Sequence, residues 1–76
     1  MTITPGGLQV VLGERPERLD ATHVRLEHAP RASEIALYRN GVRQAAGEDY
    51  VVSGDAVTLL FEWDPVNDLV VVDYWR

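Results

Sequence analysis

The stretch IALYRNGVRQ, residues 35–44, places an Asn-Gly pair between two short runs in which apolar and polar side chains alternate. Asn40 and Gly41 both tolerate positive φ, which the tight turn of an antiparallel hairpin requires. Residues 30–39 are also compatible with a helix, because a proline opens them and Ala, Ser, Glu and Leu follow. We favour the hairpin, which predicts two antiparallel strands joined at Asn40 and Gly41.

A second hairpin is predicted in VVSGDAVTLL, residues 51–60, where Ser53, Gly54 and Asp55 form a three-residue loop with glycine available for positive φ. The two runs that follow alternate with period two, which indicates half-buried strands. One face of the first run holds Val57, Leu59, Phe61 and Trp63. In the last run, Val70, Val72 and Tyr74 share a face opposite Leu69, Val71, Asp73 and Trp75.

The first half of the chain contains two further strand candidates. They are LQVVL, residues 8–12, and THVRLEH, residues 22–28, and we interpret the polar, proline-interrupted residues 13–21 between them as a linker. The total is six or seven short strands at intervals of roughly 8–12 residues. This spacing predicts an all-β protein, a small antiparallel β-sandwich of immunoglobulin-like or barrel-like form.

Seventy-six residues make one small domain with a thin core. We divide it into residues 1–15, an N-terminal strand or assembly arm, and residues 16–76, the β-sandwich module. Folds of this size are often stabilised by disulfides, metals or association. The chain has no cysteine and only two histidines, which leaves association with other chains.

The net charge of −5 argues against nucleic acid as a partner, because binding to phosphates needs clustered positive charge and the seven arginines are scattered. No run of 18 apolar residues is present, so we predict no membrane-spanning segment. The N-terminus has neither the basic start nor the apolar length of a signal peptide.

Several polar residues could suggest a metal site or catalysis, but each has a simpler explanation. His23 and His28 are five residues apart and point to opposite faces of an extended strand. Asp64 and Asp68 flank a proline turn, where Asp bonds nearby backbone N–H groups. Three further loop carboxylates lack the spacing of a calcium loop: Glu48, Asp49 and Asp55.

We therefore predict no metal and no cofactor. The two serines have no sequence context that would activate them as nucleophiles, and so small a core leaves little room for a buried pocket. The chain is accordingly predicted not to be an enzyme.

Residues 37–74 resemble a module of tailed-bacteriophage virion proteins, found in tail-fibre, baseplate and capsid-accessory subunits. The module has the pattern LYxNG, then GxDY, then SG, then DxVxVxY. The matching residues are Leu37, Tyr38, Asn40, Gly41, Gly47, Asp49, Tyr50, Ser53, Gly54, Asp68, Val70, Val72 and Tyr74. The turn before the last strand departs from the pattern, because EWDPVND replaces a short Pro-Ala-Gly turn.

This resemblance implies a compact β-sandwich that acts in assembly, located in the virion and assembled in the cytoplasm of the bacterial host. The implied partners are other virion proteins and further copies of the chain. Modules of this kind usually belong to a much longer fibre, so a chain of this size favours a small accessory subunit. In the module, Tyr50 and Tyr74 are expected to place their rings in the core and their hydroxyls at its rim.

The second face of the last strand carries more apolar side chains than a solvated face should. Either these side chains cap the edge of the core, or they form a contact with another subunit. The predicted interface comprises Leu60, Leu69, Val71, Trp75, Leu8 and Val10. Two other functions stay open: a carbohydrate- or ligand-binding sandwich that uses Trp63, Trp75 and Tyr38, and a small regulatory or toxin-related domain.

Overall fold

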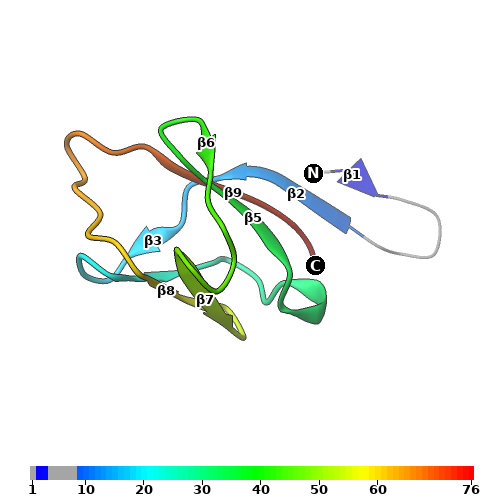
Figure 1. Cartoon of the computed structure of the whole chain (residues 1–76). Coiled ribbons are helices and arrows are strands. Elements are labelled where there is room, and N and C mark those ends of the chain that lie inside the picture. The colour runs from blue at the N-terminus through cyan, green and yellow to red at the C-terminus, as the bar shows by residue number, and fades with distance from the viewer. Residues whose placement is uncertain (1, 4–8) are drawn as a thin grey trace.

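The computed structural model describes residues 2–3 and 9–76 as two antiparallel sheets packed face to face (Figure 1). The five-stranded sheet has the order β1 (Thr2–Ile3), β2 (Gln9–Glu14), β9 (Val70–Trp75), β5 (Ile35–Arg39) and β6 (Val42–Arg43). The four-stranded sheet has the order β3 (Glu17–Arg18), β4 (His23–Arg25), β8 (Ala56–Leu59) and β7 (Tyr50–Ser53). The predicted all-β sandwich is confirmed.

The described chain has nine strands rather than six or seven, because three of them, β1, β3 and β6, are only two residues long. A single 3-10 turn, Arg31–Ser33, is the only helical element among the described residues. It precedes β5, so residues 30–39 contain a strand and not the alternative helix.

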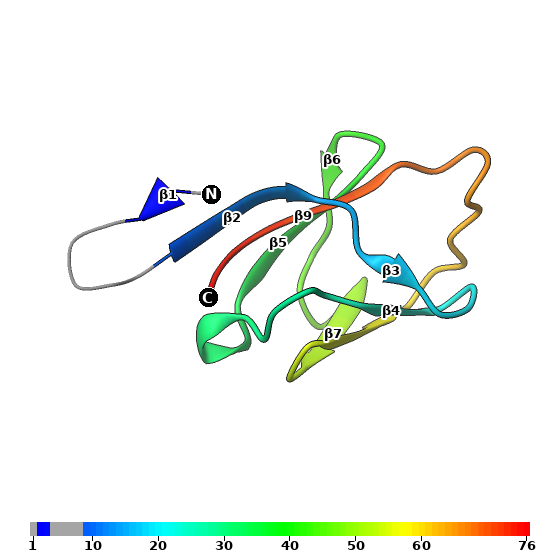
Figure 2. The ribbon, with the colours of Figure 1, turned by 180° about the vertical axis from the view of Figure 1, so that it is seen from behind.

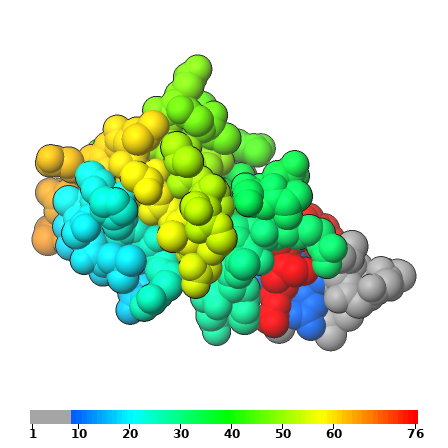
Figure 3. All heavy atoms as spheres, turned by 90° about the horizontal axis from the view of Figure 1, so that it is seen from below, coloured from blue at the N-terminus to red at the C-terminus, as the bar shows by residue number. Residues whose placement is uncertain are grey.

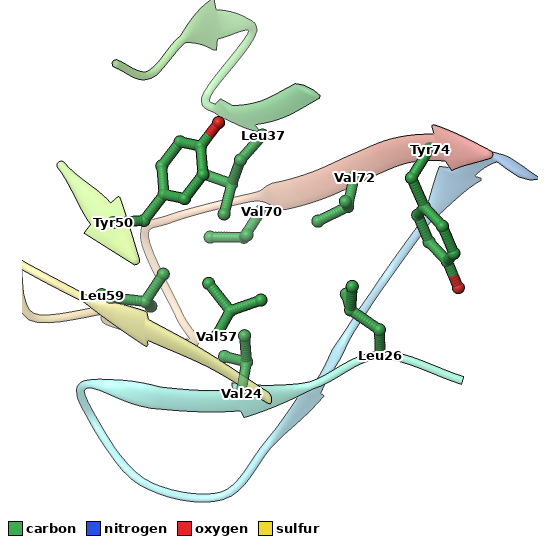
Figure 4. Close-up of a cluster of buried hydrophobic side chains, with 9 residues drawn as sticks. All are labelled: Val24, Leu26, Leu37, Tyr50, Val57, Leu59, Val70, Val72 and Tyr74. Carbon is green, nitrogen blue, oxygen red and sulfur yellow. The ribbon is translucent and has the colours of Figure 1, made fainter. Parts of the chain in front are cut away.

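The core lies between the two sheets and is formed by alternate residues of their inner strands (Figure 4). Val70, Val72 and Tyr74 of β9 are at most 3% exposed, as the alternation predicts. Phe61 and Trp63 pack against this core although β8 has already ended at Leu59. The fully buried set is Val24, Leu26, Leu37, Tyr50, Val57, Leu59, Val70, Val72 and Tyr74, and it contains no charged residue.

The hairpin at Asn40 and Gly41 is present as predicted. Arg39 pairs with Val42, and the two turn residues have φ of 54° and 81°. Positive φ at both positions is the pattern of a type I′ turn, whose twist matches that of the flanking strands.

The second hairpin differs from its prediction in one residue. Ser53 belongs to β7 and pairs with Ala56, so the turn consists of Gly54 and Asp55 alone. Gly54 has φ of 60° and Asp55 does not have positive φ, which is the pattern of a type II′ turn.

The prediction that residues 13–21 form a linker is wrong. Gly13 and Glu14 end β2, and β3 pairs with β4 in the other sheet. The register between β2 and β9 shifts between Val11 and Glu14, and Gly13 sits in this bulge with φ of 68°. Its N–H donates to Asp73 Oδ1 at 2.6 Å. The bulge redirects the chain from one sheet to the other, as Figure 2 shows from behind.

The sequence left open whether the N-terminal residues form an arm or a strand of the sandwich. Residues 9–14 pair with β9 of the same chain as β2, with Val10 opposite Trp75. Leu8, a predicted interface residue, lies outside the described residues.

We expect Gly41→Val to lower the free energy of unfolding by roughly 1–2 kcal/mol, because a β-branched residue resists the left-handed conformation that this turn requires. Urea denaturation followed by tryptophan fluorescence measures the change. The matched control is Val42→Thr, at an exposed position next to the turn, which should leave the midpoint almost unchanged. Equal midpoints for Gly41→Val and the parent would contradict the argument.

Candidate interaction surface

The side of the five-stranded sheet that faces away from the core is largely apolar. Cross-strand partners point to the same face of a sheet, and Tyr38 pairs with Val71, Ala36 with Asp73, and Val10 with Trp75. We call this surface the outer face and define it by Val10, Leu12, Ala36, Tyr38, Arg43, Val71, Asp73 and Trp75. Leu69, directly before β9, is in phase with Val71, Asp73 and Trp75 and extends the outer face.

Exposure on the outer face is substantial for its largest aliphatic and aromatic side chains. Leu12 is 66% exposed, Leu69 46% and Trp75 43%. The four-stranded sheet is a useful comparison, because its own outward rows are mostly polar. These rows are His23, Thr58 and Val51, and Arg25, Ala56 and Ser53. The two layers of one small sandwich thus differ, and the surplus of apolar surface belongs to the five-stranded sheet.

The structure brings together four of the predicted interface residues and separates a fifth. Val10, Leu69, Val71 and Trp75 share the outer face or its continuation. Leu60 follows β8 in the other layer, where its N–H donates to the carbonyl of Asp49, and it is 54% exposed. Leu60 is therefore not part of the same surface.

The outer face is hollowed where β2, β9 and β5 meet near the C terminus. This hollow has a volume of about 270 Å³ and is lined by Val10, Leu12, Glu34, Ile35, Ala36, Arg43, Asp73, Tyr74 and Trp75. Asp73 already accepts a hydrogen bond from the N–H of Gly13. Arg43 forms no ion pair with any described residue. The hollow thus combines apolar walls with three charged side chains, those of Glu34, Arg43 and Asp73.

A hydrogen-bond network centred on Glu14 joins the five-stranded sheet to the segment that follows β4. The hydroxyl of Tyr74 donates to Glu14 Oε1 at 2.6 Å, and the N–H of Glu27 donates to Oε2 at 3.0 Å. The N–H of His28 donates to the Tyr74 hydroxyl oxygen at 3.2 Å. Burial, followed by the hydrogen bond to the Glu14 carboxylate, raises the pKa of Tyr74 well above its usual value. Sequence patterns do not indicate this network, because Glu14 falls in the segment that they predict to be a linker.

A second network fixes the loop that connects β8 to β9. Arg39 stacks over the ring of Phe61, with its guanidinium carbon 4.4 Å from the ring centroid, and its Nη2 lies 3.2 Å from Asp68 Oδ2. Asn40 Nδ2 donates to Asp68 Oδ1 at 3.0 Å, and the Trp63 indole N–H donates to the Asp68 carbonyl at 3.0 Å. These contacts hold the loop against the β5–β6 hairpin.

Asp64 and Asp68 bond nearby backbone N–H groups, as predicted for residues that flank a proline turn. Asp64 Oδ1 accepts from the N–H of Val66 at 2.9 Å, and Asp68 Oδ2 accepts from the N–H of Asp64 at 3.1 Å. These hydrogen bonds to backbone N–H groups lower the pKa of both carboxyl groups. Both side chains thus have a structural role.

The three aromatic residues considered for carbohydrate binding do not gather at one place. Trp75 and Tyr38 lie on the outer face, but Tyr38 pairs with Val71, four residues before Trp75 on β9. Trp63 is partly buried against the core, and its indole N–H is bonded within its own loop. The structure does not form a continuous aromatic platform from these residues.

The two histidines are also apart. His23 Nδ1 lies 2.8 Å from Asp20 Oδ1, whereas His28 Nε2 lies 3.0 Å from Arg76 Nη1. Within the described residues, no group of three or more His, Cys, Asp or Glu side chains could hold a metal ion. No helix of the described chain is long and apolar enough to cross a membrane.

Comparison of the chain with protein-family models, with curated proteins and with solved structures gives no match in any of the three. The fold and the outer face are therefore described from this chain alone.

Tyr74→Phe should lower the free energy of unfolding by about 1.5–3 kcal/mol, because it removes the hydrogen bond from the Tyr74 hydroxyl to the charged carboxylate of Glu14. The matched control is Tyr50→Phe, since the Tyr50 hydroxyl donates to the neutral carbonyl of Ile35 at 3.1 Å. That variant should cost only about 0.5–1.5 kcal/mol. Urea denaturation at pH 7 compares the two, and a larger loss at Tyr50 would contradict the assigned strength of the Glu14 network.

The protein should also lose stability as the pH rises above about 10. The unfolded chain ionises its tyrosines near pH 10.0, whereas the raised pKa of Tyr74 keeps this hydroxyl protonated in the folded state. The folded state then binds more protons, so the free energy of unfolding falls by at most about 1.4 kcal/mol per pH unit for one such group. Denaturation midpoints between pH 8 and pH 11 should fall less steeply in Tyr74→Phe than in the parent.

Proposed function

We propose that this protein is a structural subunit that acts through protein–protein contacts made by its outer face. The observation that carries this proposal is the difference between the two layers. The outward rows of the four-stranded sheet are mostly polar, whereas Val10, Leu12, Ala36, Tyr38, Val71 and Trp75 make the outer face of the five-stranded sheet apolar. Exposed apolar faces that include aromatic residues are typical of interfaces.

The particle we propose is the virion of a tailed bacteriophage, where the chain would bind other virion proteins and further copies of itself. The resemblance of residues 37–74 to a module of such virion proteins supports this assignment. The β5–β6 hairpin at Asn40 and Gly41 and the ordered loop before Leu69 fit a compact, rigid building block. The outer face supplies the contact and needs no catalytic group.

The proposed contact is tested by comparing a lysine on the outer face with a lysine on the outward side of the four-stranded sheet. Val71→Lys on β9 should raise the dissociation constant of the assembly at least about tenfold, because it buries a charge at the centre of the interface. Val51→Lys places the same charge on the outward row of the other layer and should leave assembly unchanged. Sedimentation velocity measures association, and thermal melts verify that both variants fold. Equal effects of the two variants would contradict the assignment to the outer face.

The location is tested separately by quantitative mass spectrometry of phage particles purified from a host that carries the gene. We expect a fixed copy number of the chain per particle, comparable to that of known structural subunits. Presence in the lysate combined with absence from purified particles would refute the virion assignment.

A further inference from the structure

The turn that joins β5 to β6 contains a chemically reactive pair of residues. When glycine follows asparagine, the backbone nitrogen of the glycine can attack the side-chain amide of the asparagine, because glycine has no Cβ to hinder the approach. Asn40 and Gly41 form such a pair, and both are exposed. A Cβ added at Gly41 would meet no heavy atom of the described residues within 4 Å, so the space beside its Cα is open.

The folded structure engages the Asn40 side chain at both of its polar atoms. Its Oδ1 accepts a hydrogen bond from the N–H of Leu69 at 2.8 Å, and its Nδ2 donates to Asp68 Oδ1 at 3.0 Å. These partners fix the orientation of the amide, because only its oxygen can accept from an N–H and only its nitrogen can donate to a carboxylate. The backbone N–H of Asn40 also donates to the carbonyl of Leu69 at 2.8 Å. The side chain is therefore tied to the residues directly before β9.

These hydrogen bonds oppose the reaction of the pair. A ring between Asn40 Cγ and the Gly41 nitrogen requires the side chain to turn back over the peptide bond that follows it. The two hydrogen bonds direct the amide toward Asp68 and Leu69 instead. Ring closure therefore requires both of them to break first.

Asp68 uses its two carboxylate oxygens for different contacts. Oδ1 accepts from Asn40, whereas Oδ2 lies 3.2 Å from Arg39 Nη2 and accepts from the N–H of Asp64 at 3.1 Å. The Asp68 side chain is only 10% exposed. The part of the β8–β9 loop that is coloured orange in Figure 3 lies at one end of the molecule. Detachment of this part from the β5–β6 hairpin thus does not require the core to open.

We propose that Asn40 is a site of spontaneous deamidation, and that detachment of the β8–β9 loop from the β5–β6 hairpin controls its rate. The Gly41 nitrogen forms a bond to Asn40 Cγ, and the bond from Cγ to Nδ2 breaks. Nδ2 leaves as ammonia, with the proton that the Gly41 nitrogen loses. Water then opens the cyclic imide at either carbonyl and gives aspartate or isoaspartate, without oxidation or reduction. This inference does not depend on the proposed function.

The product cannot restore the contact that it replaces. A carboxylate at position 40 would place a charged oxygen opposite Asp68 Oδ1, where the native Nδ2 donates from 3.0 Å. Two carboxylates at this distance repel each other, and the low exposure of Asp68 reduces screening by solvent. Isoaspartate also lengthens the backbone by one methylene, which disrupts a two-residue turn. Deamidation therefore makes the detachment of the loop permanent.

The rate of deamidation is measured by incubating the protein at mildly alkaline pH and following the conversion of amide to acid by peptide mapping. The chain unfolded in urea gives the rate without structural control. The folded parent should react at least about twentyfold more slowly, because it must first break two hydrogen bonds, one of them to a charged acceptor.

Asp68→Asn should raise the rate in the folded protein roughly tenfold. The new amide keeps its one oxygen for Arg39 and Asp64 and presents a donor to the Asn40 amide nitrogen, so it removes one contact selectively. Asp73→Asn makes the same change of charge on β9, opposite Ala36, and should leave the rate unchanged. Tyr74→Phe lowers the stability of the whole fold without touching the turn, and it should also leave the rate nearly unchanged.

A second experiment tests the effect of the product. Asn40→Asp should lower the urea midpoint, because it opposes two carboxylates. Combining it with Asp68→Asn exchanges the amide and the carboxylate and should restore most of the loss.

Any of three results would overturn the proposal. The first is a folded parent that reacts as fast as the unfolded chain, and the second is equal acceleration by Tyr74→Phe and Asp68→Asn, which would indicate global unfolding. The third is an Asn40→Asp variant with the urea midpoint of the parent. The first and third do not require Asp68→Asn to fold.

Discussion

The two-fold alternation of β9 is the constraint on which the rest of this structure depends. A strand at the centre of a sheet must send successive side chains to opposite sides, and β9 sends Val70, Val72 and Tyr74 into the core. Val71 and Trp75 are thereby committed to the outer face. Because β2 and β5 both pair with β9, their own alternation is set by its register. One strand thus determines the composition of the core and of the exposed apolar surface together.

Two networks of polar side chains stabilise the sandwich in addition to its small hydrophobic core. The carboxylate of Glu14 connects the five-stranded sheet to the segment that follows β4, through Tyr74 and the N–H of Glu27. The carboxylate of Asp68 connects the β8–β9 loop to the β5–β6 hairpin, through Arg39 and Asn40. Hydrogen bonds to charged groups are among the stronger polar contacts in proteins. These carboxylates therefore add to the stability that the hydrophobic core provides.

Local features of the fold were predictable from the sequence, and features that join distant residues were not. The hairpin at Asn40 and Gly41 followed from two adjacent residues that accept positive φ. Gly13 directly follows the predicted strand at residues 8–12, and this position is the one sequence signal that could indicate the bulge. The bulge itself was not predictable, because Asp73, which accepts a hydrogen bond from Gly13, lies 60 residues away.

Leu60 shows a different limit. The alternation of apolar and polar residues shows which side of its sheet a residue occupies. It does not show to which of the two sheets the residue belongs. Leu60 and Leu69 were consequently placed on one surface, and the structure places them on different layers.

The strand order has a consequence for how the protein forms during synthesis. β2 and β5 are separated in the five-stranded sheet by β9, which is made after both of them. Until residues 70–75 have left the ribosome, the sheet lacks its middle strand, and β2 and β5 lack the strand with which both of them pair. Hairpins such as β7–β8 can close early, but the contacts between β2 and β9 span about 60 residues of chain and must wait. Folds dominated by such distant pairings form slowly. The apolar strands of the nascent chain therefore stay exposed until β9 is available to pair with them.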